Sequence, residues 1–184
     1  MTGDVTFNIT IDPIYDGEYN NGEAQPVNIN SVYYATIQDA VNNVKDGEVI
    51  KVATGTYTEV VKVTGGKNFT LEAAGPNVVI AALDHQSNAT PSTVKVKGIT
   101  FDNSVTTATA PNIAPCVGAW GGNLTFEDCA FIVAGTSGKE TGVMTWWTTE
   151  NNVMSLSFNN CTFEGKDDHA NARAMQIYGY VNME

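Results

Sequence analysis

The chain contains few basic residues. Among its 184 residues, nine are lysine or arginine and twenty are aspartate or glutamate, which gives a formal net charge of −11. Arg173 is its single arginine. Nucleic acids and anionic lipid surfaces are bound through clustered basic side chains. The composition therefore excludes nucleic acid and anionic lipid as partners.

Long apolar runs are also missing. No stretch approaches the roughly 20 apolar residues that a membrane-spanning helix needs, and the N-terminus lacks the charged-then-apolar layout of a signal peptide. We therefore predict no membrane insertion. The opening Met1-Thr2-Gly3 fits a natural start or the cut end of a piece from which a leader and other domains were removed, and we favour the second interpretation.

Cysteine is scarce too, with three thiols at Cys116, Cys129 and Cys161. Their number and spacing fit neither a dense disulfide framework nor a paired Cys-x-x-Cys zinc site. We therefore predict no cofactor and no metal bound through sulfur.

Residues 1–32 are predicted to form an N-terminal strand followed by an acidic loop. Val5, Phe7, Ile9 and Ile11 alternate with other residues, as in a half-buried strand. The next segment, 12–26, is rich in Asp, Glu, Asn and Gly and has little to bury. It is a turn-rich connection, an ordered loop lying on another part, or the tail of a preceding domain.

One helix is predicted from Ile37 to Val44. Thr36 can accept hydrogen bonds from the free amides of the first turn, and Asp46-Gly47 is a typical helix end. Four apolar residues fall on one helical face: Ile37, Ala40, Val41 and Val44.

From Glu48 onward the sequence predicts short strands. Apolar runs at 48–53, 60–63, 69–73 and 78–82 alternate with Gly, Asn and Pro turns. Strands this short fit a sandwich, a barrel or a stack of repeated turns, so internal repetition decides between these folds.

The second half of the chain contains two repeated patterns. One is centred on Phe101, Phe126 and Phe158, at spacings of 25 and 32 residues. In a parallel stack, equivalent residues lie about 4.8 Å apart on neighbouring strands. We expect these phenylalanines inside, Cys129 beside Cys161, and a polar corner formed by Asn103, Asp128 and Asn160. The second pattern begins at Val117, Met144 and Met175.

The segments 34–41, 46–52 and 55–59 resemble the beginning of many proteins of the pectate-lyase-like superfamily. The resemblance covers residues 33–184 and implies an all-β fold, a single-stranded right-handed parallel β-helix with a short N-terminal capping α-helix. After Val181 the next strand of the pattern is cut short and has no cap, so we expect a C-terminal truncation. Open strand edges there predict end-to-end contact with another subunit or domain.

The segment Gly55-x-Tyr57-x-Glu59 is similar to one in pectin methylesterases. The other catalytic segments of that family are absent from this sequence. We therefore interpret Gly55 as a corner residue, Tyr57 as packed on the helix and Glu59 as a residue that holds the turn.

The densest group of ionisable residues lies at 166–169. Asp167, Asp168 and His169 are candidate catalytic residues, because two carboxylates beside a histidine can exchange protons or bind calcium. A solvated corner loop explains the same residues, and we favour that interpretation. His85, next to Asp84, is also expected in a loop.

An aromatic strip is the stronger candidate site. If Val117, Met144 and Met175 point inward, alternation along the strands also turns Ala119, Trp146 and Ile177 inward. Three aromatic residues then point outward, and Tyr180 lies nearby. Sugar rings pack on such flat surfaces, whereas a covering loop or a register shifted by one residue would bury the rings. The predicted ligand-binding residues are Trp120, Trp147, Tyr178 and Tyr180.

The sequence therefore predicts a non-catalytic module, adhesin-like or glycan-binding, with a polysaccharide or glycan as partner. Similarity to modules of multidomain surface proteins of Gram-positive bacteria implies an extracellular or cell-surface location. The alternatives are a polysaccharide lyase, pectinesterase or glycoside hydrolase with incomplete catalytic coils, and a purely structural stalk.

Overall fold

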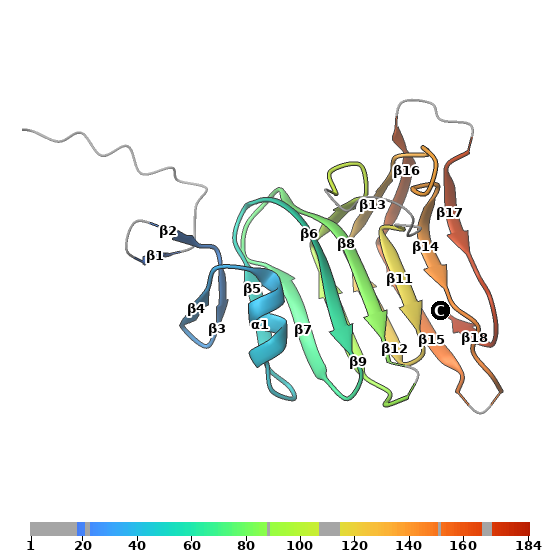
Figure 1. The fold of residues 1–184 in the computed structure, drawn as a ribbon, viewed down its shortest axis with the longest axis horizontal. Helices are drawn as coiled ribbons and strands as arrows, with labels where there is room; N and C mark the ends of the chain where they lie inside the picture. Colours follow the sequence, from blue (N-terminus) through green and yellow to red (C-terminus); the bar gives the residue numbers. More distant parts are fainter. Residues whose placement is uncertain (1–17, 21–22, 88, 107–114, 151, 167–170) are drawn as a thin grey trace, which may run out of the picture.

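The computed structural model describes residues 18–20, 23–87, 89–106, 115–150, 152–166 and 171–184, which are mostly strands (Figure 1). The strand predicted over residues 5–11 lies outside the described residues. The acidic segment that follows contains a small antiparallel pair of strands, β1 (Glu18–Asn20) and β2 (Glu23–Gln25).

Two eight-stranded sheets make up the rest of the β structure. Sheet 1 follows the order β18-β15-β12-β9-β7-β5-β3-β4. Its strands are β3 (Val27–Ile29), β4 (Val32–Tyr34), β5 (Val49–Val52), β7 (Asn68–Ala73), β9 (Thr93–Lys97), β12 (Asn123–Glu127), β15 (Met154–Asn159) and β18 (Val181–Met183).

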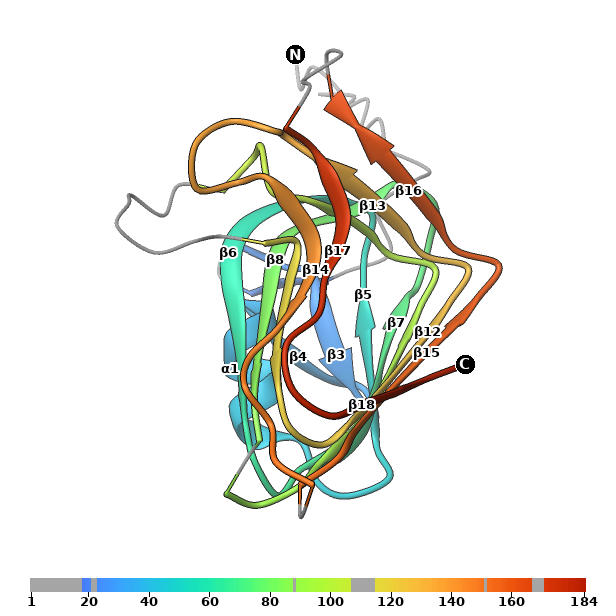
Figure 2. The ribbon, with the colours of Figure 1, turned by 90° about the vertical axis from the view of Figure 1, so that its right-hand side faces the viewer.

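Sheet 2 follows the order β16-β13-β10-β8-β11-β14-β17, and β6 also pairs with β8. Figure 2 shows the two sheets facing each other across the core. The strands of sheet 2 are β6 (Gly55–Thr64), β8 (Val78–Gln86), β10 (Thr100–Asp102), β11 (Val117–Trp120), β13 (Ala130–Val133), β14 (Thr141–Thr145), β16 (Thr162–Gly165) and β17 (Arg173–Gln176).

The predicted single-stranded parallel β-helix with a capping helix is wrong. Sheet 2 branches at β8, because β10 pairs with the first half of this strand and β11 pairs with its second half. Sheet 1 continues beyond β5 into β3 and β4, which pair antiparallel. The coarser expectation of an all-β chain agrees with the structure, and most of its strand pairs are parallel.

The reason for this error is visible in β8. Its predicted run stopped at Ala82, because Asp84 and His85 read as loop residues, but the strand continues to Gln86. Alternation along the strand turns His85 inward beside Leu83, and both are buried. A polar residue on the inner face therefore concealed the second half of the strand.

The helix itself forms where it was predicted, as α1 (Ile37–Asn43). Thr36 is its N-cap, and the Thr36 Oγ1 accepts a hydrogen bond from the Asp39 amide at 3.0 Å. The helix packs against β6 and against β3 to β5. It therefore shares the N-terminal end of the molecule with antiparallel strands and does not cap that end alone.

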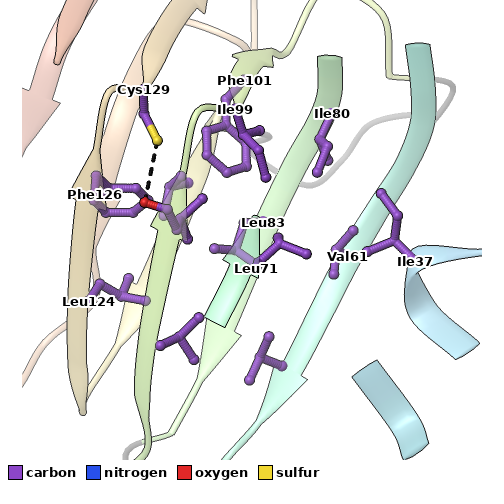
Figure 3. Packing of buried hydrophobic residues seen from close by; sticks show 14 of the residues in the cluster. Ile37, Val61, Leu71, Ile80, Leu83, Ile99, Phe101, Leu124, Phe126 and Cys129 are labelled. Carbon is purple, nitrogen blue, oxygen red and sulfur yellow. Dashed lines mark hydrogen bonds between the residues drawn. The ribbon is translucent and has the colours of Figure 1, made fainter. Parts of the chain in front are cut away.

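Phenylalanines form the centre of the core (Figure 3). Phe126 pairs in parallel register with Phe158, and their rings stack at 5.3 Å, as predicted. Phe101 was assigned to the wrong row, because it pairs with Phe131, which in turn pairs with Phe163. Two phenylalanine rows from different sheets thus meet edge to face, with the Phe126 and Phe131 centroids 5.3 Å apart.

The expected corner residues are also partly reassigned. Asp128 and Asn160 have positive φ angles of 54° and 53°, and the Asn160 Nδ2 donates to the Asp128 Oδ1 at 2.6 Å. The equivalent corner before β10 is Gly98, with φ 66°. Asn103 instead is buried, and its Oδ1 accepts from the Ala134 amide at 2.8 Å. The corner therefore needs a left-handed backbone, which Gly, Asp and Asn adopt most easily.

Strands β16, β17 and β18 end the sheet paths on one side of the molecule (Figure 1). Phe163 on β16 and Phe158 on β15, the neighbour of β18, are half-buried, whereas Phe126 and Phe131 on the preceding strands are fully buried. The core is thus less covered at this end, and the predicted end-to-end contact stays a prediction. No helix in the described part of the chain is long and apolar enough to cross a membrane.

Candidate functional site

The four predicted ligand-binding residues lie at or just beyond strand ends. Trp120 is the last residue of β11 and is 37% exposed. Trp147 follows β14 and is 73% exposed, the largest exposure among the large hydrophobic residues of the described chain. Tyr178 follows β17 and is half-buried, and Tyr180 precedes β18 and is 54% exposed.

The strand register differs from the predicted one by one residue. Val117 pairs with Val143, which in turn pairs with Met175, so Val143 takes the place predicted for Met144. Ala119 pairs with Thr145, and the Trp146 amide donates to the Ala119 carbonyl at 2.8 Å.

This shift makes Trp146 the equivalent of Trp120. Trp146, predicted to point inward, is half-buried, and its Nε1 lies 3.8 Å from the position that a Cβ on Gly118 would occupy. Ile177, also predicted inward, is 39% exposed. Sequence reasoning therefore missed Trp146 as a surface residue. Aligning Val143 with Val117, two β-branched residues that both face the core, would have found it.

Trp147 and Tyr178 come from neighbouring strands and contact each other. Their ring centroids are 5.4 Å apart and their planes are inclined by 38°. The Gln176 Nε2 donates a hydrogen bond to the Tyr178 hydroxyl. We call Trp120, Trp146, Trp147 and Tyr178 the aromatic row.

Two threonines hold the turn that carries the tyrosines. The Thr145 Oγ1 accepts from the Tyr178 amide at 2.7 Å and donates to the Tyr178 carbonyl at 2.8 Å. The Thr148 Oγ1 makes the same pair of bonds with Tyr180, at 2.8 and 2.9 Å. Both threonines are buried, so they fix the backbone at Tyr178 and Tyr180, and a fixed backbone lowers the entropy cost of binding.

Gly179 lies between the two tyrosines with φ +80°, and a Cβ there would come within 2.3 Å of the Thr148 amide nitrogen. The position therefore requires glycine.

The candidate catalytic residues Asp167, Asp168 and His169 lie outside the described residues. Arg173, near them in sequence, is exposed at the start of β17. The described chain contains no group of three or more His, Cys, Asp or Glu side chains that could hold a metal ion.

Glu59 has a structural role. Its carboxylate accepts hydrogen bonds from the Ile37 and Gln38 amides, at 3.0 and 3.1 Å, and so satisfies the first turn of α1. The Tyr57 hydroxyl donates to the Ala53 carbonyl at 2.7 Å. The side chains of Tyr57 and Glu59, in the segment that is similar to pectin methylesterases, thus form hydrogen bonds to the helix and to the turn before β6.

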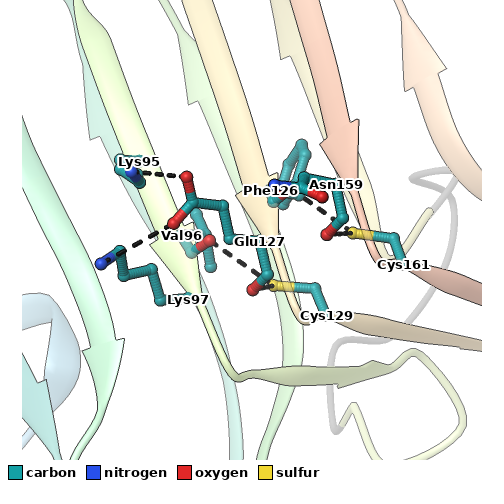
Figure 4. A network of polar contacts seen from close by, with 8 residues as sticks. All are labelled: Lys95, Val96, Lys97, Phe126, Glu127, Cys129, Asn159 and Cys161. Carbon is teal, nitrogen blue, oxygen red and sulfur yellow. Dashed lines mark hydrogen bonds and ion pairs between the residues drawn. The ribbon is translucent and has the colours of Figure 1, made fainter. Parts of the chain in front are cut away.

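Glu127 and the cysteines form a network on the outer face and corner of sheet 1 (Figure 4). Lys95 lies 2.5 Å and Lys97 3.7 Å from the Glu127 carboxylate, and the hydrogen bond from Lys95 is the main reason that the pKa of Glu127 is lowered. Cys129 and Cys161 follow equivalent corners, as predicted, and both are free thiols. Burial raises the pKa of Cys129 to about 11, so this thiol is unreactive at neutral pH.

His85 was expected in a loop but is fully buried in β8. Its Nε2 lies 2.7 Å from the Ser92 Oγ. Burial lowers its pKa to about 4, so the ring is neutral at pH 7. A side chain with no exposed surface cannot reach a substrate, and His85 is therefore part of the interior.

The aromatic row is the candidate site that the described residues support best. Comparisons with protein-family models, with curated proteins and with solved structures find no match for this chain.

Proposed function

We propose that the chain is a non-catalytic module that binds carbohydrate through the aromatic row. The observation that carries the proposal is the Trp147–Tyr178 pair, a 73% exposed indole beside a tyrosine whose backbone Thr145 holds in position. The C–H faces of sugar rings pack on such surfaces, and pre-formed aromatic sites lose little entropy on binding.

The surroundings of the pair favour carbohydrate over a protein partner. Gln176 and Tyr178 provide an amide and a hydroxyl beside the rings, and these groups can orient sugar hydroxyls. The centres of protein interfaces are depleted in charged residues, whereas two threonines and a glutamate follow Trp147 directly in the sequence.

The proposed setting is a secreted or cell-surface bacterial protein. This part rests on the sequence resemblance to surface-protein modules, and the pectate-lyase-like resemblance itself stays a prediction. The enzyme alternative has less support, because Glu59 is engaged by helix amides.

A glycan array that holds both neutral and uronate-containing polysaccharides tests the proposal. We expect the wild-type chain to bind at least one glycan, and Trp147→Ala to weaken that binding about tenfold or more. The matched control is Val32→Ala, which shortens a 56% exposed apolar residue on β4, an end strand of sheet 1, whereas the aromatic row lies on sheet 2.

Absence of binding by the wild type would remove the carbohydrate proposal and leave a structural stalk. Equal binding by Trp147→Ala would show that the aromatic row is not the site. Release of reducing ends, unsaturated products or methanol from pectins would overturn the non-catalytic assignment.

A further inference from the structure

The aromatic row continues across several parallel strands. Trp120 pairs with Gln86 of β8, and Trp146 follows the Ala119–Thr145 pair of β11 and β14. Tyr178, just after β17, lies against Trp147. Neighbouring strands are about 4.8 Å apart, so the site presents a ring at each strand along a line perpendicular to the strands.

Outward-facing amides accompany these rings. Gln86, at the β8 end of the line, is exposed, and its Nε2 donates to both carboxylate oxygens of Asp84 at 3.2 Å. Gln176 lies at the β17 end and donates to the Tyr178 hydroxyl. Hydrogen-bonding groups with no net charge thus lie at both ends of the line.

The members of the aromatic row have no charged residue within two sequence positions. Charge enters at the β8 end of the line, where Asp84 is paired in register with the exposed Lys62 of β6, and these two charges are of opposite sign. The whole chain has a net charge of −11. An anionic polymer such as a polyuronate would therefore be repelled by the chain as a whole, with one lysine beside one aspartate as its counter-charge at this end.

We propose that this line of residues binds an uncharged polysaccharide, extended across the strands from Gln86 to Tyr178. The inference rests on the proposed function and adds to it the ligand class and the direction of the chain. The Trp147–Tyr178 pair forms one subsite, and Trp120 forms a second subsite on the next strand, because β11 pairs with β14. The line from Gln86 to Tyr178 crosses three strand spacings, about 14 Å. An oligosaccharide therefore contacts both subsites, and a monosaccharide contacts one.

Calorimetry on the full chain tests the inference. The probes are the monosaccharide and the hexasaccharide of the neutral polysaccharide that binds best on the array, with galacturonate and hexagalacturonate beside them. We expect the neutral hexasaccharide to bind at least about tenfold more tightly than the monosaccharide. Its affinity should stay within about twofold between low salt and about 0.5 M NaCl, because no charge pairs form.

Two variants separate the subsites. Trp120→Ala is expected to weaken hexasaccharide binding about tenfold and to leave monosaccharide binding at the Trp147–Tyr178 pair within about twofold. Trp147→Ala is expected to weaken both. Val32→Ala serves again as the control, and circular dichroism checks that each variant is folded.

The outcomes distinguish the inference from the proposed function. Trp147-dependent binding of oligogalacturonates alone, weakened by salt, would overturn the neutral-ligand inference and keep carbohydrate binding. If neutral oligosaccharides bind with an affinity that does not depend on their length, or that Trp120→Ala does not change, the ligand does not extend across the strands and that part of the inference is overturned. Absence of all binding would overturn the proposed function together with the inference.

Discussion

His85 is a histidine that the folded chain keeps neutral. Its ring has no exposed surface, and the groups around it include Ser92, Ser87, Gly122 and the backbone of Gly121. None of these groups carries a charge that could stabilise an imidazolium. Burial lowers the pKa of His85 from 6.5 to about 4, and the hydrogen bond with the Gly121 backbone opposes this shift only in part.

The free energy of unfolding should fall as the solution is acidified between these two pKa values. The unfolded chain takes up the proton near pH 6.5, and the native chain only near pH 4. The contribution of the neutral His85 to the free energy of unfolding is complete above pH 6.5. It declines as the pH falls toward 4 and is lost below that pH, and the total change is about 3 kcal/mol. Urea unfolding across this pH range measures it.

His85→Gln is the matched control, because its amide can still bond to Ser92 but does not titrate. Carboxyl groups titrate in both proteins, so the difference between wild type and variant isolates the histidine. The same pH dependence in both proteins would show that His85 does not contribute to acid sensitivity.

The corners between strands of the two sheets share one backbone requirement. Gly98, Asp128 and Asn160 occupy equivalent positions after β9, β12 and β15, each with a φ between 53° and 66°. A residue with a Cβ other than Asn or Asp loses about 1 kcal/mol in this conformation. The repeated corner is thus specified by the backbone and not by a polar contact.

We expect Asp128→Ala to be less stable than Asp128→Gly by about 1 kcal/mol. Both variants remove the hydrogen bond to Asn160, so the comparison measures the backbone alone. Urea denaturation at neutral pH gives the two free energies. Equal stabilities would mean that the corner relaxes when its side chain changes.

The corner residues that follow β9, β12 and β15 explain which strand alignments could be predicted from the sequence. Phe126 and Phe158 were aligned correctly, because each is followed by an Asx-Cys-x-Phe segment. Phe101 has no second phenylalanine shortly after it in the sequence, so it could be aligned either with Phe126 and Phe158 or with Phe131 and Phe163. Gly98, the left-handed corner residue that precedes β10, shows that Phe101 follows the corner and belongs with Phe131. The helix was predictable, because Thr36 and its apolar face are local signals.

The branching at β8 could not be predicted, since it depends on strand pairing between residues far apart in sequence. The exposed Trp120 and Trp147 were found from alternation, but their register was not. Met144 resembles Met175 chemically, whereas the register pairs Val143 with both Val117 and Met175. One residue of shift was enough to exchange Trp146 and Trp147 in the predicted row.

The excess of acidic residues acts on the folded chain as a whole. With a net charge of −11, the acidic side chains repel one another more strongly in the compact folded state than in the unfolded state, and this repulsion lowers the stability of the fold. The pairs of Lys95 and Lys97 with Glu127 oppose this effect, but their side chains are partly exposed, so they contribute little.

Added salt should therefore stabilise the fold. Raising NaCl from about 0.02 M to about 0.2 M should increase the free energy of unfolding, on the order of 1 kcal/mol. Urea, which is uncharged, is the suitable denaturant. A lower urea midpoint at higher salt would show that attractive pairs outweigh the general repulsion.

Strand β8 is the hydrogen-bonded link between the two arms of sheet 2, one that runs through β10 to β16 and one that runs through β11 to β17. Within the hydrogen bonds of sheet 2, a load passes from one arm to the other only through this nine-residue strand. The ends of the arms are joined a second time by the chain itself, since β16 and β17 are consecutive strands that also contact each other. Tension between β16 and β17 would therefore be shared by two routes, as by springs in parallel, and β8 would carry only its share.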